Sequence, residues 1–293
     1  MKDPHMKVRI GVAAGAGVAD DGPAFLELVD ALDELGYDSI WVPDIITTPT
    51  LDPIAALSVA AGRRSRLKLG THLIIPGRNP VLLAKQLATL DQLSNGRLLL
   101  MAVLGLRQPA ELAAQGVEAG DRPAMLEESL QIMRTLWAGD EHDGVRLAVR
   151  PHQEPLELWL GGQVPAALRR CGRIGEGWMP GMVTPAEARE SREQIEAAAA
   201  THNRIIDAEH FGMNVSWVSA TTGITDDVRA AVASRRSDLA AEDVIGIGPD
   251  GLAEKLQAFL DVGFSKFVVR PARTPALWSD AVAEVADVLR LQS

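Results

Sequence analysis

The sequence predicts an α/β fold, a closed (β/α)8 TIM barrel. Three observations predict it: short apolar segments alternate with longer segments of helical period along the whole chain, there are eight such apolar segments, and 293 residues can form one barrel, which commonly takes about 250. The same alternation fits an open, doubly wound sheet. The count of eight favours the closed barrel.

The predicted strands are rich in Val, Ile and Leu, as is typical of parallel strands that are buried on both faces. In chain order they cover residues 8–13, 39–42, 67–72, 97–103, 156–160, 177–180, 211–218 and 266–270.

Three predicted helices begin with a capping side chain followed by proline, after Asp52, Asn79 and Thr184. Thr184 and Glu187 have the spacing of a capping box. Other helices are indicated by apolar residues three or four apart, which we expect to pack as a face. These are Leu28, Leu32 and Leu35 before Gly36; Leu83, Leu87 and Leu90 before Asn95 and Gly96; and Leu252, Leu256 and Phe259 before Gly263.

Two segments interrupt the alternation, residues 105–121 and residues 139–154. The second is predicted to be a loop with a small hairpin, and long excursions of this kind often act as lids. No shift in composition marks a second domain, so residues 6–293 are interpreted as one barrel domain. Residues 1–5, which precede a second methionine at Met6, resemble an added leader.

The composition excludes several classes of protein. A lone cysteine, Cys171, allows neither an internal disulfide nor a Cys/His zinc cluster, and it fits a cytoplasmic protein. A net charge of -10 without a Lys/Arg cluster argues against nucleic-acid binding. No signal peptide or membrane span is predicted, since no apolar run approaches about 18 residues.

In a TIM barrel the active site lies where the strands end. Asp44 and His72 follow or end the second and third predicted strands, and Gly105 follows the fourth. His72 either is a hydrogen-bonded structural residue or contacts a cofactor ring or relays a proton. Asp44 is equally compatible with a cap or salt bridge and with a ligand contact.

Gly161, Gly162 and Gln163 link the fifth strand to a helix. Glycines allow close approach of a ligand to the backbone, and a helix N-terminus offers free amides, so this segment predicts phosphate binding; a simple tight turn is the alternative. It lacks the alternating glycines of a dinucleotide fingerprint. Trp178, next to Gly177, either stacks on a ring at the barrel mouth or packs in the core.

Residues 67–97, which include LKLGTH, PGRNP and LAKQLATLDQLSNGR, resemble the luciferase-like monooxygenase family. The segments IWVPD (40–44), LWLGG (158–162) and GEGW (175–178) agree with the family in the same order, and the resemblance extends over nearly the whole chain from Met6. Within the family, the coenzyme F420-dependent oxidoreductases of actinobacteria are the most similar branch.

The resemblance implies a barrel with an insertion after the fourth strand and a homodimer. It implies a small-molecule substrate and F420, or alternatively FMN, as cofactor. It also implies a cis peptide bond between His72 and Leu73, whose bulge would press against the cofactor ring. The cofactor contacts that it implies are Asp44, His72, Leu73, Gly105, Gly161, Gly162, Gln163, Gly177 and Trp178.

Two positions depart from the family pattern. Ile45 stands where members with hydride chemistry often have His, and Leu106 stands where some have Glu. His72 or a group of the substrate would then have to handle the proton. Three functions follow: F420-dependent hydride transfer, an FMN-dependent monooxygenase served by a separate reductase, or a cofactor-binding barrel without catalysis.

Overall fold

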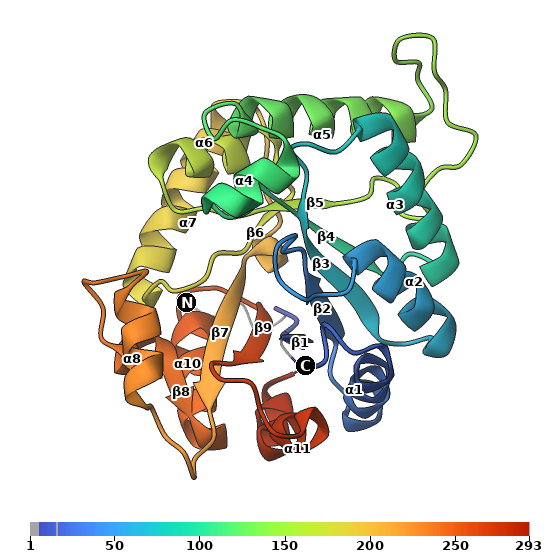
Figure 1. Ribbon diagram of the computed structural model, residues 1–293. Coiled ribbons are helices and arrows are strands. Elements are labelled where there is room, and N and C mark those ends of the chain that lie inside the picture. The colour runs from blue at the N-terminus through green and yellow to red at the C-terminus, as the bar shows by residue number, and fades with distance from the viewer. Residues whose placement is uncertain (1–5, 16, 293) are drawn as a thin grey trace.

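The strands form a single parallel sheet that closes into a barrel (Figure 1). The structure, a computed structural model, describes residues 6–15 and 17–292. The strands run in the order β6-β5-β4-β3-β2-β1-β9-β7-β8. Isolated parallel bridges, Trp178 to Phe211 and Gly181 to Asn214, join the segment around β6 to β7 and complete the ring. The closed barrel predicted from the sequence is therefore confirmed.

All eight predicted strands are present, and one more was missed. The strands are β1 (Arg9–Ala13), β2 (Ser39–Pro43), β3 (Lys68–Ile74), β4 (Leu98–Val103), β5 (Leu158–Leu160), β6 (Gly177–Trp178), β7 (Gly212–Val218), β8 (Ile245–Ile247) and β9 (Lys266–Pro271). The missed strand, β8, is three residues long and lies between two helices, so it has too few residues to show a strand pattern. The predicted leader, residues 1–5, lies outside the described residues.

The helices surround the sheet as an outer layer (Figure 1). They are α1 (Gly22–Leu35), α2 (Pro53–Arg63), α3 (Pro80–Ser94), α4 (Pro109–Gln115), α5 (Arg122–Ala138), α6 (Pro165–Ile174), α7 (Pro185–Ala200), α8 (Asp226–Ala233), α9 (Ala241–Val244), α10 (Gly248–Leu260) and α11 (Trp278–Glu284), with 3-10 turns at Ala208–His210 and Ala286–Leu291.

The predicted caps are confirmed. Asp52 accepts a hydrogen bond from the Ala55 amide at 2.9 Å, and Asn79 accepts from Val81 and Leu82, both at 3.0 Å. Thr184 and Glu187 form the capping box. These bonds satisfy amides that have no partner within the helix, so each helix start is fixed locally.

The predicted apolar faces cover the outside of the barrel. Leu83, Leu87 and Leu90 are at most 1% exposed. The face of α10 is similarly buried. Leu35, the last residue of α1, is 37% exposed and departs from the predicted face.

The segment at residues 105–121, expected to be irregular, contains the short helix α4, and α5 follows directly after it at Arg122. The small hairpin predicted within residues 139–154 is present as a bridge between His142 and Val145. The segment that carries it projects beyond α5 in Figure 1, whereas α4 lies over the strand ends. Of the two excursions, the first is therefore the one that borders the barrel mouth.

The barrel interior is filled below the mouth by a small apolar cluster that includes Trp41, Met101, Trp159 and Met179. Glycines make room for the large rings: a Cβ added to Gly70 would lie 2.2 Å from the Trp41 ring. This cluster forms a floor, so any ligand must enter where the strands end.

Candidate active site

Two cavities open at the ends of the strands. We call the first, about 660 Å³ in volume and lined by Asp44, His72 and Arg270 among others, the His72 cavity. The second, about 540 Å³ and lined by Gly161, Gly162 and Gln163 among others, is the Gly162 cavity. Both are bordered by the shared residues Val103, Leu104, Gly105, Gly181 and Asn214. The cavities therefore adjoin and can receive different parts of one ligand.

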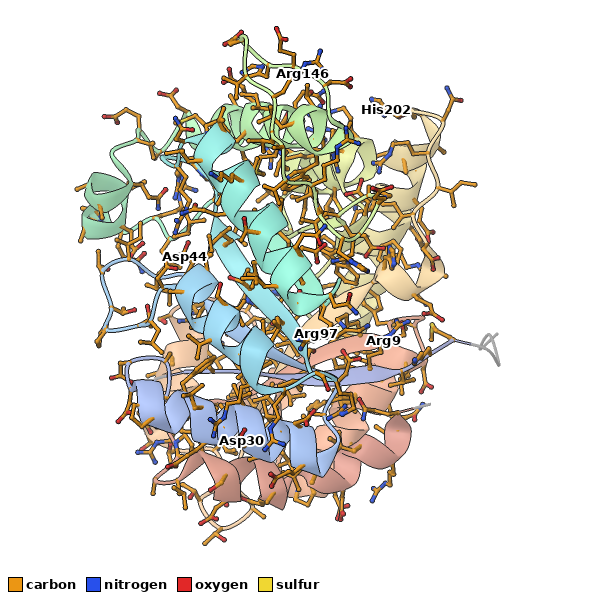
Figure 2. The ribbon with its side chains drawn as sticks, turned by 90° about the vertical axis from the view of Figure 1, so that its right-hand side faces the viewer. Arg9, Asp30, Asp44, Arg97, Arg146 and His202 are labelled. Atoms are coloured by element: carbon orange, nitrogen blue, oxygen red, sulfur yellow. The ribbon has the colours of Figure 1, made fainter. Side chains whose placement is uncertain are left out.

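Figure 2 shows the barrel from the side, with Asp44 near the carboxyl ends of the strands. Arg9, which begins β1, and Arg97, which directly precedes β4, lie towards the opposite end. All the strand pairs are parallel, so residues that follow different strands are gathered at one mouth.

His72 lies on the interior face of β3 and lines the His72 cavity. Its ring is 5.1 Å from the Trp41 ring, centroid to centroid, and tilted by 44°. Burial, and to a lesser extent the nearby Arg270 charge, lower the pKa of His72 to about 4, although a hydrogen bond with Asn214 opposes the shift. The imidazole is therefore neutral at neutral pH and can exchange a proton with a ligand through either tautomer.

Asp44 follows β2 and fixes the loop after β3. Its Oδ2 accepts hydrogen bonds from Arg78 at 2.8 Å and from the Ile74 amide at 3.0 Å. Burial raises the pKa of Asp44 even though the Arg78 charge opposes the shift. Asp44 thus combines the two roles left open by the sequence: it makes a salt bridge and also borders the cavity.

The Gly162 cavity has the features of an anion cradle. A Cβ added to Gly161 would lie 2.5 Å from the Met101 methyl carbon, and Gly162 has a φ of +94°, so the backbone itself forms the wall. Val164, the N-cap of α6, makes no side-chain hydrogen bond to the helix. Pro165 has no amide hydrogen and the Ala167 amide donates to the Val164 carbonyl, so within the described residues the Ala166 amide is the first-turn donor that remains available. Arg107, Arg122 and Arg170 also line this cavity.

The loop after β4 is held between the two cavities. Gly105 has a φ of +81° and faces the Gln115 side chain, whose Nε2 would lie 2.4 Å from an added Cβ. Arg122 donates to the carbonyls of Leu104, Gly105 and Leu106 at 3.2, 3.1 and 2.7 Å. The rim between the cavities is thus a fixed piece of backbone.

Sequence reasoning missed Glu111, which ties α4 to the loop after β2. Its Oε1 accepts from the Thr47 amide at 2.7 Å and from the Thr47 hydroxyl at 2.6 Å, and the residue is only 1% exposed. It also missed Asn214 and Arg235, which line the His72 cavity. A polar residue within an otherwise apolar strand was an available signal for Asn214, whereas nothing in the sequence pattern marked Arg235.

The structure gathers most of the predicted contact residues at the mouth. Among the described residues, the cavity linings leave out three predicted contacts: Leu73, Gly177 and Trp178. Leu73 is fully buried in the barrel wall. Gly177 leaves room for Trp159, since a Cβ added to it would lie 2.4 Å from that ring.

Trp178 supports the core-packing alternative. Its side chain is fully buried, its ring centroid lies 6.0 Å from that of Phe264, and its indole Nε1 donates to the Gly162 carbonyl at 3.0 Å. The residue therefore braces the glycine turn from behind.

The prediction of a cis peptide bond between His72 and Leu73 is wrong. Within residues 6–15 and 17–292, the one cis bond is that between Glu154 and Pro155. β3 instead continues without a bulge through Ile74, with Leu73 paired to Ala102 and Ile74 to Val103. Regular pairing on β4 holds this part of the chain in an extended trans conformation.

No set of three or more His, Cys, Asp or Glu side chains in the described part of the chain is arranged to hold a metal ion. The described helices include none with the length and apolar character needed to cross a membrane.

The chain belongs to the luciferase-like monooxygenase family, whose model matches residues 6–265. A relative from Mycobacterium tuberculosis, the uncharacterized protein Rv0953c, is 41% identical over 149 residues, which are 47% of this chain and 52% of the relative. The F420-dependent glucose-6-phosphate dehydrogenase of Amycolatopsis mediterranei is 29% identical over 192 residues, 59% of this chain and 57% of that protein. The matches span only about half the length of these curated relatives.

Solved structures share the fold over almost the whole chain. An F420-dependent secondary alcohol dehydrogenase superposes with a TM-score of 0.80 at 18% identity, covering 97% of this chain and 100% of that one. The monooxygenase RslO1 of Streptomyces bottropensis gives 0.76 at 20% identity, with 97% and 99% covered. At such identities the likeness establishes the fold alone.

Proposed function

We propose that this protein is a coenzyme F420-dependent oxidoreductase that transfers a hydride between the cofactor and a small organic substrate. The observation that carries the proposal is the pair of adjoining cavities, an anion cradle beside a chamber that contains a neutral histidine. The F420-dependent relative named above supports this choice of cofactor.

The residues present fit such a group. The glycine turn after β5, the Ala166 amide at the start of α6 and the arginines of the Gly162 cavity would hold its phosphate. Gly105, Asp44 and His72 would border its ring. The deazaflavin supplies a carbon that accepts or donates a hydride, while the protein supplies orientation and a shielded pocket.

His72 is the residue we assign to proton transfer. Ile45 and Leu106, at the two positions where the family often has polar side chains, line the same cavity and offer no titratable group. With a pKa of about 4, His72 is neutral at pH 7 and can accept a proton, held in place by Asn214. The apolar neighbours reduce the access of water to this site.

FMN is the second cofactor to consider, because the family is that of the luciferase-like monooxygenases and an anion cradle can bind the phosphate of FMN equally well. In that case the enzyme would consume O2 and need a separate reductase. A barrel that binds cofactor without catalysis is the third possibility, since Ile45 and Leu106 remove familiar polar groups.

The first test is equilibrium binding of oxidised F420 and of FMN to the purified protein, followed by fluorescence quenching. We expect F420 to bind at least about tenfold more tightly than FMN, a difference of about 1.4 kcal/mol. Tighter binding of FMN would transfer the protein to the monooxygenase alternative. Tight F420 binding without turnover on a broad panel of alcohols and carbonyl compounds would indicate the non-catalytic barrel.

The role of His72 is tested by His72→Ala, with the exposed His202→Ala as the matched control. Loss of a proton-transfer group is expected to lower kcat by about 100-fold or more, with a smaller change in F420 affinity. The control should leave both unchanged. An unchanged kcat in His72→Ala would remove His72 from the reaction.

A further inference from the structure

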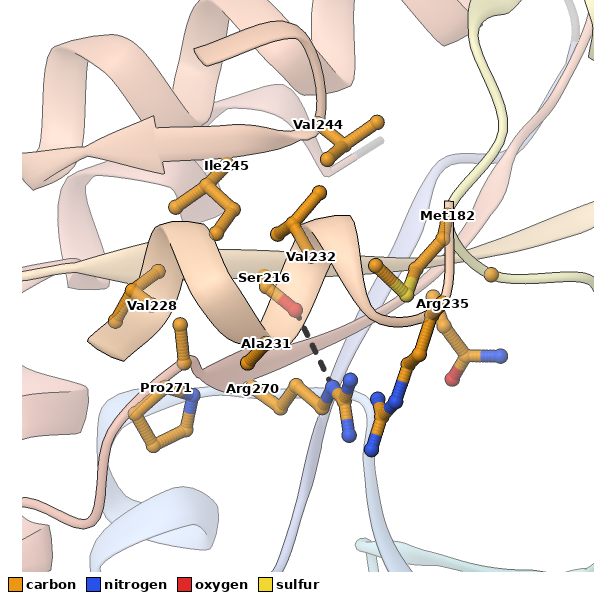
Figure 3. Close-up of a pocket in the computed structure, with 13 residues that line it drawn as sticks. Met182, Ser216, Val228, Ala231, Val232, Arg235, Val244, Ile245, Arg270 and Pro271 are labelled. Carbon is orange, nitrogen blue, oxygen red and sulfur yellow. Dashed lines mark hydrogen bonds between the residues drawn. The ribbon is translucent and has the colours of Figure 1, made fainter. Parts of the chain in front are cut away.

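Two arginines at one side of the His72 cavity are not used by the function proposed above. Arg270 is near the end of β9, and Arg235 follows α8; both line this cavity and the smaller recess beside it. Figure 3 shows their guanidinium groups lying close to each other where the recess opens. Two elements distant in the sequence thus bring two positive charges to one place.

Neither arginine is neutralised by a carboxylate within the described residues. The Nε of Arg270 donates to the Ser216 hydroxyl at 3.2 Å. The Arg235 side chain makes no hydrogen bond or ion pair with any of the described residues. Neighbouring arginines differ in this respect. Arg236 pairs with Glu187 at 2.6 Å, and Arg273 pairs with Asp227 at 3.2 Å.

The surroundings do not supply a negative charge either. Asp44 is the one carboxylate in the described lining of the His72 cavity, and it is already paired with Arg78. The lining of the smaller recess includes no Asp or Glu. The mouth therefore carries local positive charge although the whole chain has a net charge of -10.

We infer that Arg235 and Arg270 form a subsite for an oxyanion, a phosphate or carboxylate group on the substrate. Two guanidinium groups held side by side repel each other, and an oxyanion between them would replace this repulsion with charge-assisted hydrogen bonds. The Ser216 hydroxyl holds Arg270 in place, and Asn214, which borders both cavities, lies between this subsite and the Gly162 cavity.

The position of the subsite separates it from the anion cradle. The cradle belongs to the Gly162 cavity, whereas the two arginines line the His72 cavity and not the Gly162 cavity. A substrate anchored here by its oxyanion would place its remaining atoms in the His72 cavity, beside the imidazole. The identification of the bound molecule as the substrate rests on the proposed function, but the existence of the anion site does not.

The test is calorimetric titration of the cofactor-free protein with inorganic phosphate and, separately, with acetate, in Arg235→Gln, Arg270→Gln and the wild type. The loss of one charged donor should weaken binding at the subsite by about tenfold to a hundredfold. Arg273→Gln, which removes a paired surface arginine, is the matched control and should bind as the wild type does. Phosphate binding stronger than acetate binding would indicate a phosphorylated substrate, and the reverse a carboxylate.

Phosphate can also bind in the cradle, so F420 affinity is measured on the same variants. Anion binding that weakens while the F420 dissociation constant stays within about threefold supports the inference. Anion binding that weakens in a protein that binds no F420 supports the subsite and contradicts the proposed function. Anion binding equal to the wild type in both variants, or an F420 affinity that falls in parallel with it, overturns the inference.

Discussion

Lys266 and Arg270 occupy the same strand, β9, four residues apart, yet their surroundings are opposite. Lys266 is 3% exposed, and its Nζ lies 2.9 Å from the Asp38 carboxylate. Arg270 is open to the cavity, and the side-chain hydrogen bond that it makes within the described residues is to the neutral Ser216 hydroxyl. At the start of the strand, the positive charge of Lys266 is neutralised by Asp38. At its end, the positive charge of Arg270 has no carboxylate partner within the described residues. The closed end of the barrel thus has its charge paired within the protein, and the open end carries the unpaired charge that we propose binds an anion.

The largest effect is expected from Asp38→Asn, which leaves Lys266 buried without its counter-charge. Removing one partner of a buried ion pair costs about 3–5 kcal/mol in the free energy of unfolding. Urea denaturation measures it, with Asp227→Asn as the control, because that carboxylate pairs with Arg273 at the surface and should cost at most about 1 kcal/mol. Equal costs in the two variants would contradict the distinction between the ends.

The next effect is expected from Gly70→Ala. The new methyl would lie 2.2 Å from the buried Trp41 ring, so the ring or the strand must shift, at a cost of about 1–3 kcal/mol in unfolding free energy. Gly62→Ala is the matched control. It lies in α2 with nothing within 4 Å of an added Cβ, so it should stabilise the protein by about 0.5–1 kcal/mol. A neutral result for Gly70→Ala would show that the floor is loosely packed.

The smallest effect concerns pH and the open end. The pKa of His72 is about 4 in the folded protein, below its ordinary value of 6.5, so the unfolded chain binds more protons between these values. Stability should therefore rise as pH increases from about 4 to 6.5, and be fully present above that range. Since solvent reaches His72 through the cavity, we expect this rise in the free energy of unfolding to be about 1 kcal/mol.

His72→Gln should remove this part of the pH dependence, whereas His202→Gln, an exposed control, should retain it. Thermal denaturation across this pH range measures the difference. A His72→Gln profile that runs parallel to the wild type would mean that the imidazole is not desolvated as described.

Local signals predicted much of the fold. Asp52, Asn79 and Thr184 mark helix starts because a cap is made within a few residues of itself. Eight strands were also readable as apolar segments, whereas the three-residue β8 was not. The glycine turn at 161–162 was found for the same reason, since close backbone approach needs glycine whatever surrounds it.

The direction in which side chains point was not readable. Strands buried on both faces show no polar alternation, so nothing in the sequence told whether Gly177 or Trp178 faces the barrel interior. The structure places Trp178 in the wall, against Phe264, and leaves the interior to Trp159. The prediction of a cis bond after His72 was wrong for a related reason, because the pairing of β3 with β4 determines the backbone conformation there.

The sequence by itself therefore determined the eight strands of the barrel ring, the helix caps and the family, because each is marked by residues that lie close together in the chain. Only the tertiary structure decided which residues meet. Arg235 and Arg270 are brought together by barrel closure, and the lowered pKa of His72 results from burial and from Arg270, far along the chain. Charge and burial act through space, so their effects appear only when distant segments are packed.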